Sequence, residues 1–270
     1  MASCVLLASV MYHWMYLLIA GVCCGFLNAA ASSGSAITLP VLLALGLPPA
    51  LANGTNRLPV LVGMATAFWS FQRRRAIPWS FVLRLLPAFL LSALLGAGLA
   101  SALPMGQIRL LVHVAVALAL LLLLFKPQRW LHDGADLTDS IFPSARLQVA
   151  MAGVGLWTGL IVLDAGTYLL ISLVLIGGLS LKQANAVKVV LVGGATLISL
   201  AVFIVGGEID WPSAFPLMLG SAVGGRFGAA VALGPSARQW IYRLLILALL
   251  LELASMVWIW ISPSTKPFMM

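Results

Sequence analysis

The sequence predicts an all-α polytopic membrane protein built from two inverted repeats with broken or re-entrant helices near the membrane midplane. Of its 270 residues, 62% are hydrophobic and only 8% are charged, whereas a soluble domain carries about a quarter charged residues. Shifted against itself by 132 residues, the distance from Gly34 to Gly166, the chain aligns without a gap. Each half also contains an apolar run that polar residues interrupt at the matching position.

Small and polar residues carry this repeat. A chain rich in Leu and Ala produces coinciding Leu and Ala by chance, but not matched Asn, Trp and Gly in one register. We therefore expect a first transmembrane repeat at 1–125, a cytoplasmic linker at 126–146 and a second transmembrane repeat at 147–270. The matched residues include Ala52-Asn53 with Ala184-Asn185, Trp79 with Trp211, and Gly96-Ala97 with Gly228-Ala229.

The first half begins with an apolar run at 5–31, which exceeds the ~20 residues that a membrane-spanning helix needs. A polar break at 32–35 separates it from a short apolar piece at 36–47. Pro48-Pro49 ends that piece, because proline suits a helix start and disrupts a helix interior. Further helices are expected at 50–71, 79–102 and 107–125.

The second half repeats this order, with an apolar run at 147–163, a break at 164–167, a short piece at 168–176 and helices at 181–205, 211–233 and 237–261. The loop after the first long helix is Arg73-Arg74-Arg75, and its counterpart holds Glu208 and Asp210. Since cytoplasmic loops are enriched in Lys and Arg, the first loop should lie inside and the second outside. Inverted halves of this kind are typical of secondary transporters.

Enzyme and nucleic-acid functions have little support in the sequence. It has no Ser/His/Asp arrangement, no phosphate-cradling glycine loop and no cluster of metal ligands, so neither an enzyme nor a cofactor is expected. The net charge of +8 is explained by cytoplasmic loops, because no basic stripe interleaved with aromatic residues suggests a nucleic-acid partner.

The two breaks are the predicted substrate site. Paired interruptions in two halves mark binding sites in carriers, and the free N–H groups of short helices that begin there favour an anion. A charge inside the membrane costs ~2.5–3.5 kcal/mol even on a lenient scale, so Arg57 and Lys188 need a purpose; snorkelling to the headgroups is the alternative. The expected substrate-binding residues are Ser32, Ser33, Ser35, Asn53, Thr55, Asn56, Arg57, Thr167, Asn185 and Lys188.

Asp164 is the one acid next to a break. Two roles are open for its carboxylate. It could carry a coupling proton, or it could cap the short helix that follows the break.

Two stretches carry a family resemblance. Leu-Gly-Leu-Pro-Pro-x-x-Ala-x-Gly-Thr-Asn-Arg at 45–57, with Gly63 and the Arg-Arg-Arg-Ala-Ile-Pro-Trp run at 73–79, resembles the first half of the TauE/SafE sulfite exporter family. Gly-Leu-Ser-Leu-Lys-Gln-Ala-x-Ala-x-Lys at 178–188, followed by Gly-Glu-Ile-Asp-Trp at 207–211, is similar to its second half. Where that family usually has a glycine run before its first Pro, this chain has Ala and Ser at 29–33.

The resemblance implies a multi-pass secondary carrier of the bacterial inner membrane. We expect it to export small sulfur-containing anions, sulfite or organosulfonates, by alternating access, with the lipid bilayer as its surroundings. The coupling ion, H⁺ or Na⁺, and assembly as a homodimer are left open. Two other functions stay open as well: a passive anion channel, and a non-transporting membrane assembly or partner protein.

Overall fold

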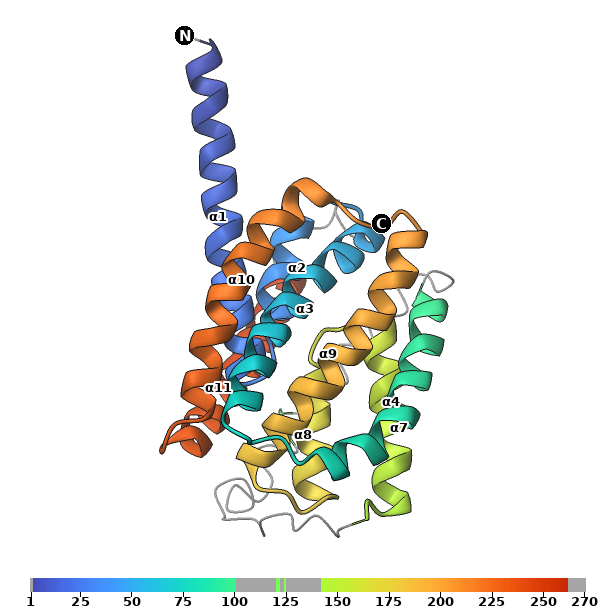
Figure 1. Cartoon of the computed structure of the whole chain (residues 1–270). Coiled ribbons are helices and arrows are strands. Elements are labelled where there is room, and N and C mark those ends of the chain that lie inside the picture. Colours follow the sequence, from blue (N-terminus) through green and yellow to red (C-terminus); the bar gives the residue numbers. More distant parts are fainter. Residues whose placement is uncertain (1, 101–119, 122–123, 125–141, 262–270) are drawn as a thin grey trace.

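The computed structural model describes residues 2–100, 120–121, 124 and 142–261, and their regular structure is entirely helical (Figure 1). The predicted all-α class is confirmed for this part of the chain. Among the described residues, four helices are long and apolar enough to cross a membrane, namely Met11–Ala30, Trp79–Ala100, Leu181–Val205 and Trp211–Ala232. Most of the expected helix at 107–125 and most of the linker at 126–146 lie outside the described residues.

The first half contains α1 (Ala2–Ala30), α2 (Ser35–Ala44), α3 (Pro49–Arg73) and α4 (Trp79–Ala100). The break after α1 covers 31–34, one residue earlier than the predicted 32–35, and Ser35 begins α2. Pro49 begins α3, where its missing N–H would be unpaired in any case. After α3 the chain turns at Arg75, which has a positive φ of 49°. The break, the turn before Pro49 and the turn at Arg75 thus separate α1, the short α2, α3 and α4.

The second half contains α7 (Ala145–Leu160), α8 (Ala165–Leu175), α9 (Leu181–Val205), α10 (Trp211–Ala232) and α11 (Ala237–Ile261). Side-chain caps begin three of these helices: Ser144 caps α7, Ser180 caps α9 and Asp210 caps α10. The bounds of α9 and α10 equal those of α3 and α4 shifted by 132 residues. The sequence repeat is therefore also a repeat of helix boundaries.

The second break lies earlier than the sequence predicted. The expected apolar helix ran to residue 163, but α7 ends at Leu160, the interruption covers 161–164, and Thr167 belongs to the first turn of α8. Ile161 is extended (φ −145°, ψ 128°) and Asp164 is left-handed (φ 53°). Hydropathy missed this unwinding because the side chains at 161–163 are apolar and stay buried in the core.

Each half contributes one long helix that packs mainly against the other half. Helix α4 of the first half packs mainly on α7 and α9 of the second half, and α10 of the second half packs mainly on α1 and α3 of the first. A Cβ atom at Gly96 of α4 would lie 2.0 Å from the Leu156 carbonyl oxygen, and one at Gly228 of α10 would lie 2.3 Å from that of Phe26. These glycines are register mates, so the repeated Gly marks the close approach of α4 to α7 and of α10 to α1.

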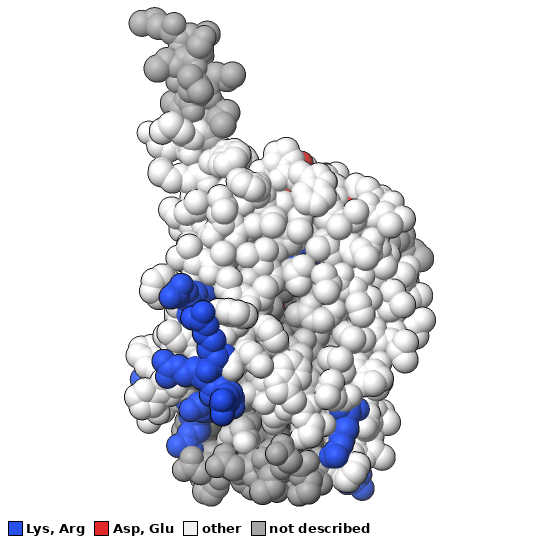
Figure 2. Space-filling view, viewed as in Figure 1, with Lys and Arg blue, Asp and Glu red and all other residues white. Residues whose placement is uncertain are grey.

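Helix direction and charge divide the molecule into two ends. In Figure 1, α3 runs downward from the α2–α3 turn, whereas α9 runs upward from the α8–α9 turn. Figure 2 shows Lys and Arg gathered toward the lower end of this face, while acidic atoms appear near the upper end. The exposed Arg73, Arg74 and Arg75 end α3, and Glu208 and Asp210 lie in the turn after α9.

The α4–α7 contact can be tested with two glycines of α4. Gly96→Ala places a Cβ atom against the backbone of α7, and overpacking of this kind costs ~1–3 kcal/mol, so we expect a lower melting temperature in detergent. Gly98→Ala is the control, because a Cβ atom there meets nothing within 4 Å and Ala favours a helix by up to ~1 kcal/mol over Gly. Equal melting temperatures for the two variants would contradict this packing.

Candidate functional site

The two breaks touch each other. The Ser33 hydroxyl donates to Asp164 Oδ1 at 2.8 Å and lies 3.5 Å from Thr167 Oγ1. Ser32 Oγ would lie 2.2 Å from a Cβ atom at Gly166, so a side chain there would displace the Ser32 hydroxyl. Residues more than 130 positions apart therefore meet at one buried polar centre.

The Asp164 carboxylate accepts hydroxyl groups from both halves but caps no backbone N–H of its own helix. Asp164 is 1% exposed and occupies the N-cap position of α8, but its side chain accepts no backbone N–H there. Oδ1 accepts the Ser33 hydroxyl and, at 3.4 Å, that of Thr167, while Oδ2 has no partner within the described part of the chain. The capping interpretation is therefore wrong, and a buried oxygen of this acid stays available.

Lys188 and Asn185 of α9 hold the carboxyl end of α1. Lys188 Nζ donates to the carbonyl oxygens of Asn28 at 2.7 Å and Ala31 at 2.8 Å. Asn185 Nδ2 donates to the carbonyl oxygen of Ala29 at 3.0 Å. The last carbonyls of a helix have no partner within the helix and carry partial negative charge, so a cation is favoured there.

Arg57 and Asn53 of α3 do the same for α7. Arg57 donates through Nη1 to the Thr158 carbonyl and through Nη2 to the Gly159 carbonyl, both at 2.7 Å. Asn53 Nδ2 donates to the Leu160 carbonyl at 3.3 Å. Asn53 and Asn185 are register mates, so equivalent amides hold the broken helix of the opposite half.

Neither cation reaches the surface, because Arg57 and Lys188 are both 0% exposed. Arg57 Nη1 also donates to Ser199 Oγ at 2.8 Å, and its guanidinium carbon lies 4.7 Å from the centre of the Phe203 ring. Snorkelling to the headgroups therefore describes neither side chain. Both contribute to the polar interior, and the oxygen acceptors of both are neutral.

Sequence reasoning missed several polar contacts of this interior. Asn28 Oδ1 accepts the backbone N–H of Gly34 at 3.0 Å and so closes the turn between α1 and α2. The Thr38 hydroxyl donates to Asn56 Oδ1 and connects α2 to α3. A polar residue just before a break, as at Asn28, or one turn after it, as at Thr38, is the signal that could have found them.

Thr55 is the predicted residue that the structure keeps away from both breaks. Its hydroxyl accepts the backbone N–H of Asp210 at 2.8 Å and so holds the α9–α10 turn. Helix α3 approaches this turn closely, since a Cβ atom at Gly54 would lie 2.0 Å from the Glu208 carbonyl oxygen.

The predicted residues are closed off, and part of their hydrogen-bonding capacity is unused. All eleven, Asp164 included, are at most 4% exposed. Buried polar groups in folded proteins are nearly always paired. Among the predicted residues, four groups that can donate lack a partner within the described part of the chain, and all four belong to the first half: Ser32 Oγ, Ser35 Oγ, Asn56 Nδ2 and Arg57 Nε. The hydroxyl of Thr196 in α9, which was not predicted, lacks one as well.

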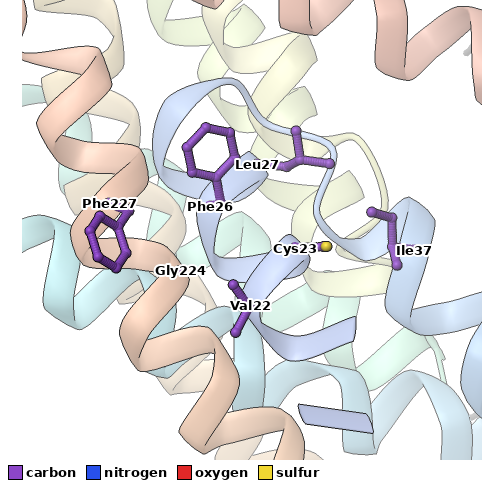
Figure 3. Close-up of a pocket in the computed structure, with 7 residues that line it drawn as sticks. All are labelled: Val22, Cys23, Phe26, Leu27, Ile37, Gly224 and Phe227. Carbon is purple, nitrogen blue, oxygen red and sulfur yellow. The ribbon is translucent and has the colours of Figure 1, made fainter. Parts of the chain in front are cut away.

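An apolar pocket of about 270 Å³ lies among α1, α2 and α10 (Figure 3). None of the predicted site residues lines it, and its walls offer no strong donor to a charged ligand. The lining residues are Val22, Cys23, Phe26, Leu27, Ile37, Gly224 and Phe227. A small anion would not be bound there.

Residues 17–256 match the protein family described as "Sulfite exporter TauE/SafE". The chain belongs to the sulfite exporter TauE/SafE family. This is a family of membrane transporters, so the predictions that the protein is a multi-pass membrane transporter and not an enzyme are confirmed. No solved structure was found to match this TauE/SafE chain.

Three curated relatives carry similar descriptions. A "Probable membrane transporter protein" of Haemophilus influenzae is 28% identical over 219 residues, which cover 79% of this chain and 82% of the relative. "Probable membrane transporter protein ORF9" of Sinorhizobium sp is 26% identical over 83% of this chain and 84% of its own length. "Probable membrane transporter protein YfcA" of Escherichia coli K12 is 26% identical, with 77% of each chain covered.

The contact between the breaks can be tested by a disulfide. We replace Cys4, Cys23 and Cys24, introduce Ser33→Cys with Thr167→Cys, and place a protease site in the 126–146 linker. Because the two native hydroxyls are 3.5 Å apart, the cysteines should come within reach of a disulfide. After oxidation and cleavage the two halves should migrate together on a denaturing gel and separate on reduction.

The control pair is Thr55→Cys with Thr167→Cys. It also places one cysteine in each half, but Thr55 contacts the α9–α10 turn and not the second break. It should give no bridge. Halves that separate without reduction in the Ser33/Thr167 variant would contradict the contact between the breaks.

Proposed function

We propose that this TauE/SafE protein is a secondary carrier that exports a small sulfur-containing anion, sulfite or an organosulfonate, across the bacterial inner membrane by alternating access. The observation that carries the proposal is the set of buried, unpartnered donors at Ser32, Ser35, Asn56 and Arg57. A sulfur oxyanion brings several acceptor oxygens and a negative charge. It would therefore satisfy these donors.

The chemistry around the breaks favours an anion. Arg57 and Lys188 bring two positive charges, against the single carboxylate of Asp164. Arg57 keeps the Nε–H and one Nη2 hydrogen for a ligand, and a guanidinium binds an oxyanion through two donors in a plane. Helices α2 and α8 also begin at the breaks, where their N-terminal N–H groups add to the attraction.

The closed state of the site favours a carrier over a channel. Since no predicted site residue is more than 4% exposed, an anion could reach the centre only after a rearrangement. A passive channel instead needs a continuous path. Movement of one helix group against the other would open the breaks to each side in turn, as in other carriers with broken helices.

An inverted arrangement of the two halves fits the helix directions and the charges. The α1–α2 hairpin would enter from the acidic end, and the α7–α8 hairpin from the basic end, each as a re-entrant unit (Figures 1 and 2). The opposite directions of α3 and α9 and the packing of α4 and α10 against the opposite halves support this proposal. The basic end would face the cytoplasm.

Transport against a gradient requires a coupling ion, H⁺ or Na⁺. Asp164 is the candidate for a proton, because Oδ2 is buried and unpartnered while Oδ1 accepts from Ser33. In this proposal the predicted residues of the first half supply unused donors for the anion, and the second half supplies the carboxylate for the proton. Assembly as a homodimer stays a prediction.

The topology is tested with reporter fusions. A reporter fused after Arg75 should report the cytoplasm and one fused after Gly207 the outside, because the basic turn follows α3 and the acidic turn follows α9. Compartment-specific enzymatic reporters measure the side. Both reporters on the same side would contradict the inverted arrangement.

Substrate binding is tested with purified protein. Sulfite or an organosulfonate should raise the melting temperature more than sulfate or a carboxylate at equal concentration, because a ligand that binds the folded state stabilises it. Arg57→Lys should weaken binding by about tenfold or more, since a hydrogen bond to a charged group contributes ~1.5–3 kcal/mol.

Two variants control for structural effects of Arg57→Lys. Arg73→Lys lies at the exposed end of the same helix, and Ser199→Ala removes one hydrogen bond of Arg57 without removing its charge. Unchanged affinity in folded Arg57→Lys would exclude this site. Anion currents far above carrier turnover would favour the channel, and the absence of any ligand-dependent stabilisation would favour the assembly protein.

A further inference from the structure

The Lys188 ammonium donates hydrogen bonds to two backbone carbonyl oxygens. It is fully buried and donates to the Asn28 and Ala31 carbonyl oxygens at 2.7 and 2.8 Å, while Asn185 takes the Ala29 carbonyl between them. These oxygens end α1 of the first half, whereas Lys188 belongs to α9 of the second half. The ammonium thus places one positive charge against two carbonyl oxygens at the carboxyl end of α1.

In carriers with broken helices, unwound carbonyls and the carboxyl ends of half-helices commonly coordinate the coupling Na⁺. A lysine ammonium has the same charge and is attracted to the same oxygens. The Lys188 side chain reaches them along the second break, because its Cδ would lie 3.0 Å from a Cβ atom at Gly166. Packing at Gly166 therefore guides the lysine to the end of α1.

We propose that Lys188 is a built-in cation that occupies, at the carboxyl end of α1, the position where a coupling Na⁺ would bind. The carrier then works without Na⁺, and the carbonyls of Asn28 and Ala31 accept a small free cation only when the lysine is shortened. The equivalent end of α7 is filled in the same way by Arg57. The inference rests on the proposed carrier function and assigns its coupling to an ion other than Na⁺.

The test is chemical rescue of Lys188→Ala. This variant lacks three carbons and the ammonium nitrogen of lysine, which correspond to n-propylammonium. Its melting temperature should fall below that of the wild type, and ethylammonium or n-propylammonium chloride should restore about half of the loss, because a cation that binds only the folded state stabilises it. N-methylglucamine chloride at equal ionic strength is the reference salt.

Lys182→Ala is the matched control. Lys182 lies in the first turn of the same helix and is exposed, so its removal should create no response to alkylammonium ions. Wild type should also show none, and NaCl should not stabilise it relative to N-methylglucamine chloride. A Na⁺-specific stabilisation of the wild type would overturn the proposal, as would the failure of every alkylammonium ion and of Na⁺ to restore Lys188→Ala.

Should Lys188→Ala not fold, Lys188→Asn replaces it, because Asn stands at the register mate, Asn56, and leaves a smaller gap. Methylammonium is then the matching probe, present throughout purification. Failure of this variant to be recovered or stabilised also counts against the proposal. All salts are chlorides and no sulfur anion is used, so a failed anion-binding experiment and a failed rescue remain distinguishable.

Discussion

The structure depends on one constraint: a helix that ends inside the membrane leaves carbonyl oxygens that lipid cannot satisfy. Helices α1 and α7 both end in the buried interior of the protein, where water is equally absent. Their last carbonyls receive Lys188 and Asn185 in one case, and Arg57 and Asn53 in the other. Because these donors come from the opposite half, neither half can complete its own break. Mutual satisfaction of the breaks therefore also fixes how the halves dock.

Close packing follows from the same requirement. A side chain on α9 reaches the end of α1 only if the intervening backbone segments approach closely, and Gly166 leaves room for Ser32 Oγ and for the Lys188 stem. Gly96 and Gly228 allow the same kind of close approach away from the two breaks, where α4 and α10 pack against the opposite half. Matched Gly and matched Asn in the sequence are thus two consequences of a single docking geometry.

Much of this fold could be predicted from the sequence, because hydropathy, proline and glycine positions and the repeat register indicate where the helices begin and end. The bounds of α9 and α11 agree with the expected ranges 181–205 and 237–261. The unwinding of Ile161, Val162 and Leu163 could not be read, since apolar residues give no signal for a backbone that unwinds inside protein. For the site, burial of Arg57 and Lys188 followed from the cost of an intramembrane charge, but their acceptors did not, because backbone carbonyls have no sequence signature.

Divergence between the duplicated halves explains why the site is not symmetric. Lys188 stands where the first half has Asn56, Arg57 stands where the second half has Val189, and Asp164 stands where the first half has Ser32. Among the predicted site residues, the unused donors are consequently left on the first half and an unused carboxylate oxygen on the second. The Ser33–Asp164 hydrogen bond joins these two unlike halves, so a change at Asp164 acts directly on a break residue of the first half.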